Sequence, residues 1–121
     1  MRWMPLLLAL YPIQNHADFD IGADAYRQSD YATAIQTFIP LAENGDARAQ
    51  TVIALMYKYG ESVDQNLKTA FSWYLQAAER NYAPAQFHAG TMLADGRSVD
   101  KNRKSAIIWL TKAISSLCSS S

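Results

Sequence analysis

The sequence contains two similar copies of one segment, and this repetition restricts the possible folds more than any other feature. SVDQNLKTAFSWYLQA begins at Ser62, and SVDKNRKSAIIWLTKA begins at Ser98, 36 residues later. When residues 47–82 are aligned with residues 83–118, 13 of the 36 positions are identical. Average composition would give only about two or three matches. Repeats of about 20–50 residues are typical of supersecondary units that stack on one another.

A third, less similar copy precedes these two. In its second half, Asp30 lies 36 residues before Asn66. In its first half, Ile21 lies only 32 residues before Ile53. The difference, 36 − 32 = 4, predicts that the connection between the two halves is four residues shorter in the first unit.

Each half of a unit has the spacing of an amphipathic helix, with apolar residues at i, i+3, i+4, i+7 and i+8. In the second unit these residues are Ala70, Trp73, Tyr74, Ala77 and Ala78. Residues that can cap helices stand at the ends of such segments. The predicted N-caps are Asp30, Asn66 and Asn102, and the predicted helix-ending positions are Gly45, Gly60, Asn81 and Gly96. No segment shows sustained alternation, so no strand is predicted.

Small and large residues alternate in a way that suits close helix packing. Small residues let helices approach, and large residues fill the spaces beside them. The small ones are Ala49, Ala54, Ala70 and Ala77, and the large ones are Phe38, Tyr57 and Trp73. A single hairpin would leave one apolar face bare, and the next hairpin covers it. We therefore predict an all-α fold, a right-handed α-solenoid of about three stacked helix-turn-helix repeats. The units are about 19–46, 47–82 and 83–118.

The first 17 residues differ in composition from the rest of the 121-residue chain. Arg2 precedes a short apolar stretch from Met4 to Ile13, and Ala17 suits the position before a cleavage site. This pattern predicts a secretory signal peptide over 1–17, a repeat domain over 18–121, and a periplasmic or secreted location. The alternatives are an apolar helix that caps the domain and a cytoplasmic protein. The apolar stretch is far shorter than the ~20 residues of a membrane span, so we expect no retained span.

The composition excludes some classes of partner. Eleven basic residues balance eleven acidic ones, whereas binding to nucleic acid needs a clustered positive excess. The single cysteine, Cys118, excludes a disulfide framework.

The repeated motifs resemble the Sel-one-like repeat family, a branch of the tetratricopeptide superfamily. The resemblance rests on residues 47–82 and on APAQFHAGTMLADGRSVDKNRKSAIIWLTKAI, and it extends from about Phe19 to Leu117. It departs from the family where Glu61 and Ser62 replace a usual glycine, and where ISSLCSSS ends the last unit. The resemblance implies a non-catalytic scaffold or adaptor, of the kind found in bacterial signalling and secretion. Cysteine-rich relatives imply an alternative, a hydrolase of cell-wall or β-lactam substrates, but this chain lacks their cysteine pairs.

The residues themselves offer little catalytic chemistry. Catalysis needs a nucleophile, a base and an orienting group brought together. His16 lies in the leader, and His88 is predicted to lie on a partly buried helix face. Asp64 and Asp100 repeat at one loop position, which favours structural hydrogen bonds. We therefore predict no enzymatic activity, no cofactor and no metal.

The first helix of each hairpin is predicted to line a concave face that binds a protein or peptide partner. Its side chains are aromatic, apolar and charged, a mixture that suits an extended peptide or a partner helix. The predicted binding residues are Tyr26, Arg27, Arg48, Thr51, Leu55, Lys58, Tyr59, Phe87, Thr91 and Asp95, with Phe19, Ala23 and Ala94 beside them. Trp73, Trp109 and Tyr57 repeat in register and are assigned to the core instead of to an aromatic cage.

The last predicted helix carries apolar residues beyond its core stripe. They are Ile107, Leu110, Ile114 and Leu117. A terminal repeat should present a polar outer face, so this stripe predicts either self-association or a chain that ends before its next repeat. The polar ending favours the second explanation. A self-associating fragment of a longer repeat protein is therefore a further alternative.

Overall fold

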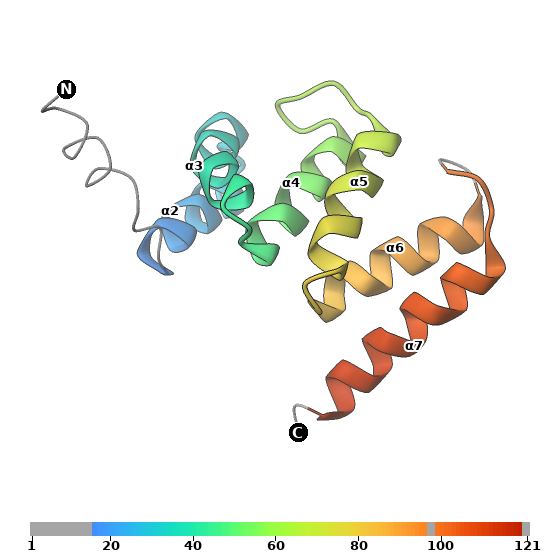
Figure 1. The fold of residues 1–121 in the computed structure, drawn as a ribbon. Coiled ribbons are helices and arrows are strands. Elements are labelled where there is room, and N and C mark those ends of the chain that lie inside the picture. The colour runs from blue at the N-terminus through green and yellow to red at the C-terminus, as the bar shows by residue number, and fades with distance from the viewer. Residues whose placement is uncertain (1–15, 97–98, 120–121) are drawn as a thin grey trace, which may run out of the picture.

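The computed structural model describes residues 16–96 and 99–119, which form six α-helices and no strand (Figure 1). The helices are α2 (His16–Arg27), α3 (Tyr31–Glu43), α4 (Ala47–Tyr59), α5 (Leu67–Ala78), α6 (Ala83–Asp95) and α7 (Arg103–Ser119). Consecutive helices pair as α2–α3, α4–α5 and α6–α7, and the three hairpins stack in chain order (Figure 1). This arrangement confirms the predicted all-α, right-handed solenoid of helix-turn-helix repeats.

Most of the predicted signal peptide lies outside the described residues. The described structure begins at His16, so Ala17 is the second residue of α2.

The helices begin where the sequence predicts. The side chains of Asp30, Asn66 and Asn102 accept hydrogen bonds from the backbone amides three residues later, at 3.3, 3.0 and 3.0 Å. Asp46 caps α4 in the same way, accepting from the amides of Arg48 and Ala49. These bonds satisfy amides that have no partner within the helix. The N-cap predictions are confirmed.

The predicted helix ends are confirmed as well. Gly60 and Gly96 stop α4 and α6 in the left-handed conformation, with φ of 70° and 69°. Gly45 and Asn81 have φ of 95° and 65°, and they turn the chain from one hairpin into the next. Only glycine and asparagine adopt this conformation at low cost.

The connections within the hairpins differ in length as predicted. Three residues, 28–30, join α2 to α3, whereas seven, 60–66, join α4 to α5. The difference is 7 − 3 = 4 residues. In the longer connection, the amide of Asn66 donates to the carbonyl of Tyr57, and in the third repeat Asn102 donates to Leu93. These two hydrogen bonds join equivalent positions of the second and third repeats.

The core consists of two clusters, one at each joint between hairpins. The first joins α2, α3 and α4, and the second joins α4, α5 and α6. The four predicted small residues, Ala49, Ala54, Ala70 and Ala77, are all fully buried. Among the predicted large residues, Phe38 is fully buried, whereas Tyr57, Trp73 and Trp109 are half-buried and pack against the clusters from the side.

Tyr74, not Trp73, fills the centre of the second repeat. It is the largest fully buried side chain of the described residues. The two positions are adjacent and therefore about 100° apart on the helix. The apolar stripe includes both, so only the rotation of α5 against its neighbours decides which one is enclosed.

Each joint between hairpins also contains one buried hydrogen bond from a glutamine. The Nε2 of Gln50 donates to the carbonyl of Ala42 at 3.0 Å, and the Nε2 of Gln86 donates to the carbonyl of Ala78 at 3.1 Å. The two carbonyls lie at the ends of α3 and α5, where helical carbonyls lack intrahelical partners. The repeated glutamine thus connects the start of one hairpin to the end of the previous one.

The last helix departs from the prediction at one residue. Ile107, Ile114 and Leu117 are exposed as predicted, but Leu110 is half-buried against Gly90 of α6. A Cβ atom at Gly90 would lie 2.7 Å from the Cγ atom of Leu110, which explains why a glycine stands there. Ile108 is exposed instead.

Within the described ranges, 16–96 and 99–119, no helix is both long and apolar enough to span a membrane. The same residues contain no group of three or more histidine, cysteine, aspartate or glutamate side chains that could hold a metal ion.

Candidate functional site

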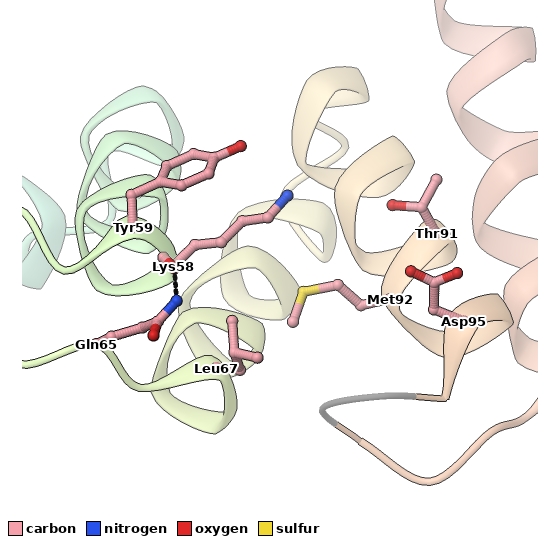
Figure 2. Close-up of a pocket in the computed structure, with 7 residues that line it drawn as sticks. All are labelled: Lys58, Tyr59, Gln65, Leu67, Thr91, Met92 and Asp95. Atoms are coloured by element: carbon pink, nitrogen blue, oxygen red, sulfur yellow. Dashed lines mark hydrogen bonds between the residues drawn. The ribbon is translucent and has the colours of Figure 1, made fainter.

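A pocket of about 280 Å³ opens between the end of α4, the connection that follows it and the second half of α6 (Figure 2). Because α4 and α6 are the first helices of two adjacent hairpins, the pocket lies at a joint between repeats. It is lined by Lys58, Tyr59, Gln65, Leu67, Thr91, Met92 and Asp95.

The connection after α4 is attached firmly to the helix end, and this shapes one wall of the pocket. The Nε2 of Gln65 donates to the carbonyl of Lys58 at 2.8 Å (Figure 2). One residue later, Asn66 donates its amide to the carbonyl of Tyr57 and caps α5. Leu67, the first residue of α5, is thereby held in the wall of the pocket.

The pocket combines charged and apolar side chains. Lys58 extends from α4 towards α6, and its Nζ lies 5.4 Å from the centre of the Tyr59 ring (Figure 2). Asp95 supplies a carboxylate on the α6 side, and Leu67 and Met92 supply apolar surface. The two ion pairs between described residues, Arg27–Asp24 and Arg48–Asp46, do not involve Lys58. The Lys58 ammonium is therefore available to an anionic group of a partner.

His88 lies on a partly buried face of α6, as predicted. Its ring stacks on Tyr74, with 4.7 Å between centroids and 19° between planes. Burial lowers the pKa of His88 below its ordinary value, and the nearby positive charge of Lys58 lowers it further. His88 is thus a neutral packing residue at neutral pH.

We expect the domain to lose stability as the pH falls below about 6.5, the pKa of an unperturbed histidine. The pKa of His88 is lower in the folded than in the unfolded chain, so the unfolded chain takes up the proton first. The stabilisation is complete above the unfolded-state pKa and is lost as the pH falls through the folded-state pKa. Urea unfolding followed by circular dichroism from pH 8 to pH 5 measures this loss. The variant His88→Gln should show a smaller pH dependence, and an unchanged dependence would contradict the assignment.

The structure brings four of the ten predicted binding residues into the pocket, namely Lys58, Tyr59, Thr91 and Asp95. The other six lie elsewhere on α2, α4 and α6. Phe87 is the most exposed aromatic residue among these six, at 53%, and it meets His88 edge-on with 5.9 Å between the ring centroids.

The remaining predicted residues of α4 have structural contacts. Arg48 is half-buried, pairs with Asp46 at 3.0 Å and lies over the Phe19 ring at 4.1 Å. Thr51 is only 7% exposed, and its hydroxyl donates to the carbonyl of Ala47. Leu55 is half-buried against the second core cluster. Thr51 therefore presents no accessible side chain to a partner, and Arg48 already contributes to the start of its helix.

The predicted residues of α2 lie away from the pocket. The hydroxyl of Tyr26 donates to the Oε1 atom of Glu61 at 2.7 Å, and burial raises the pKa of that hydroxyl. Arg27 is exposed and pairs with Asp24. Glu61 is one of the residues that depart from the family pattern. Its hydrogen bond with Tyr26 connects the first hairpin to the long connection of the second. Ser62, which follows, has a φ of 66°, the left-handed conformation that a glycine would adopt more easily.

Three pocket residues were not predicted: Gln65, Leu67 and Met92. Met92 repeats Met56, and an identity between repeats gives no sign that one edge of the side chain is accessible. Gln65 and Leu67 depend on how the long connection folds back, and no periodic pattern describes such a segment. The N-cap Asn66 was the one available signal, because it locates the start of α5.

Three stacked helical hairpins, with a pocket at one joint, define an α-solenoid repeat protein. The Sel1 repeat model matches residues 47–82 and 83–116, which is more than half of the chain. The chain therefore belongs to the Sel1 repeat family. Proteins of this family are generally non-catalytic scaffolds for protein–protein interaction.

Two solved structures are similar in fold. A Sel1 repeat protein from Oxalobacter formigenes has a TM-score of 0.74 and 32% sequence identity over 78% of this chain. A protective antigen of uropathogenic Escherichia coli strains that displays an SLR fold has a TM-score of 0.75 and 28% identity over 83% of this chain. The matched regions cover 39% and 22% of those two chains. No curated protein matches this sequence.

Proposed function

We propose that this chain is a non-catalytic scaffold that binds a peptide or protein partner in the pocket between α4 and α6. One observation carries the proposal: Lys58, Tyr59, Thr91 and Asp95, predicted as binding residues from separate repeats, line a single pocket. The family supplies the coarser class, an interaction scaffold.

The size of the pocket favours a side chain of a larger partner over a whole small molecule. Its volume of about 280 Å³ is slightly below the range of about 300–1,000 Å³ that is usual for drug-sized ligands. An apolar side chain of the partner would contact Leu67 and Met92, while a neighbouring carboxylate would pair with Lys58. The Asp95 carboxylate adds negative charge at the α6 side of the pocket, which disfavours a second acidic group of the partner there.

The proposal predicts that charge reversal in the pocket weakens binding without unfolding the domain. Peptides that bind the full chain are selected from a displayed random library, and their affinity is measured by fluorescence anisotropy. We expect Lys58→Glu and Tyr59→Ala each to weaken binding about tenfold or more, which corresponds to at least ~1.4 kcal/mol. Tyr59 is exposed and Lys58 is only half-buried, so helicity should not change.

Lys68→Glu is the matched control for this experiment. Lys68 is an exposed lysine of α5 that does not line the pocket, and its reversal makes the same change in net charge. Equal loss of binding in Lys58→Glu and Lys68→Glu would show that the peptides respond only to overall charge. Unchanged affinity in both pocket variants would place the binding surface elsewhere.

A further inference from the structure

Both ends of the hairpin stack expose apolar residues whose counterparts inside it are buried or partly buried. On α7, Ile114 occupies the repeat position of Ala78, which is 1% exposed at the joint between the second and third hairpins. Ile114 itself is 62% exposed. Ile107 occupies the position of Phe71, which packs against the second core cluster, yet Ile107 is 64% exposed.

The first helix shows the complementary feature. Ile21 occupies the position of Ile53, 32 residues later. Ile53 is 1% exposed and packs at the joint between the first and second hairpins, whereas Ile21 is 57% exposed. The outer face of α2 therefore corresponds to the surface that a later hairpin contributes to a joint. The outer face of α7 corresponds to the surface that an earlier hairpin contributes.

Charged residues at these two ends are also complementary. At the joint inside the chain, Leu67 and Met92 line the same pocket. The repeat spacing places Arg103 of α7 at the position of Leu67. It places Asp24 of α2 at the position shared by Met92 and Met56. The positions that hold the apolar Leu67 and Met92 at the inner joint therefore hold opposite charges at the two ends of the stack.

We propose that a second copy of this chain docks its α2 on α7, head to tail, with Ile21 against Ile107 and Ile114, and with Asp24 facing Arg103. This contact uses a surface other than the pocket of the proposed function. Asp24 already pairs with Arg27 of its own helix, but both side chains are more than half exposed. Such exposed pairs contribute little, so Asp24 can exchange this partner.

The charges argue against an alternative in which two α7 helices face each other. Among the residues of α7, Arg103, Lys104 and Lys112 are basic and none is acidic. Two such helices side by side would repel one another. Helix α2 carries Asp18, Asp20 and Asp24 against a single Arg27, so its charge complements that of α7.

The proposed contact should be weaker than a joint within the chain. Ile114 is larger than the alanine at its position in the two preceding repeats, so it holds the second copy further away. A head-to-tail contact also does not close on itself after two copies, and it continues for as long as free ends remain. The expected behaviour is growth in mass with concentration, past the dimer.

Sedimentation velocity of the full chain over a range of concentrations tests this contact. Ile21→Asp and Ile107→Asp should each keep the protein monomeric at concentrations at which the unaltered chain associates. Ile108→Asp is the matched control, since Ile108 is also an exposed isoleucine of α7, at 54%, but lies about 100° from Ile107 around the helix. An equimolar mixture of Ile21→Asp and Ile107→Asp should form dimers only, because each retains one functional face.

A charge exchange tests the alignment of the two helices. Asp24→Arg and Arg103→Asp should each weaken association about tenfold, and the double variant should restore it. Circular dichroism checks that each variant remains helical. An unaltered chain that stays monomeric at every concentration would overturn the proposal. So would a mixture that fails to dimerise, a double variant that stays weak, or an Ile21→Asp variant that associates normally while Ile107→Asp does not. The last result would identify a contact between two α7 helices.

Discussion

Replacing Tyr74 with alanine is expected to lower the free energy of unfolding by about 3–5 kcal/mol, the usual cost of removing a large aromatic side chain from a core. Tyr74 is fully buried in the middle hairpin and stacks on His88 of the next one. Stability in a repeat protein is approximately a sum over neighbouring units. Because the middle hairpin contacts both others, the loss should destabilise the whole domain.

Urea unfolding followed by circular dichroism measures this effect, with two control variants. Tyr59→Ala removes a tyrosine that is 60% exposed, and it should change stability by less than about 0.5 kcal/mol. Tyr74→Phe keeps the ring and removes only the hydroxyl, which is buried without a hydrogen-bond partner among the described residues. It should therefore not destabilise the domain. A large loss in Tyr74→Phe would mean that the hydroxyl makes a stabilising contact.

Replacing Ala78 with isoleucine is expected to lower the free energy of unfolding by about 1–3 kcal/mol through overpacking. Ala78 is 1% exposed, and its carbonyl accepts the buried hydrogen bond from Gln86. A larger side chain there would push the third hairpin away from the second and stretch this bond. This substitution places at an inner joint the residue type that the last repeat has at the same position, Ile114.

The matched control is Ala94→Ile. Ala94 is an exposed alanine of α6 away from the joint, so the same substitution should change stability by less than about 0.5 kcal/mol. Amide hydrogen exchange locates the damage. Relative to the unaltered protein, Ala78→Ile should increase the exchange rates more in α6 and α7 than in α2 and α3. Equal stability of the two variants would show that the joint can expand without cost.

The pattern of repeats predicted most of the fold because its determinants are local or repeated. An N-cap such as Asn66 acts on an amide three residues away, and a left-handed Gly60 acts on its own turn. Both can be recognised from residue type and spacing. The four buried alanines were also predictable, since a small residue conserved in register between adjacent repeats marks a close approach of helices.

The binding residues were predicted less completely. Position along α4 and α6 identified Lys58, Tyr59, Thr91 and Asp95, but it also included Thr51, whose hydroxyl turns back to its own helix. Periodicity states which face of a helix is apolar and leaves open how far each neighbouring helix covers it. That coverage depends on packing between hairpins.

By itself, the sequence determined the number of repeats, the ends of the helices and the small residues at their contacts, because these follow from backbone conformation and side-chain size at single positions. Only the tertiary structure decided that Tyr74 and not Trp73 is enclosed, that Gln50 and Gln86 connect consecutive hairpins, and that Leu67 and Met92 complete a pocket. These features depend on the rotation of each helix about its axis and on the path of a connection without periodicity. Both are set by contacts between residues distant in the chain.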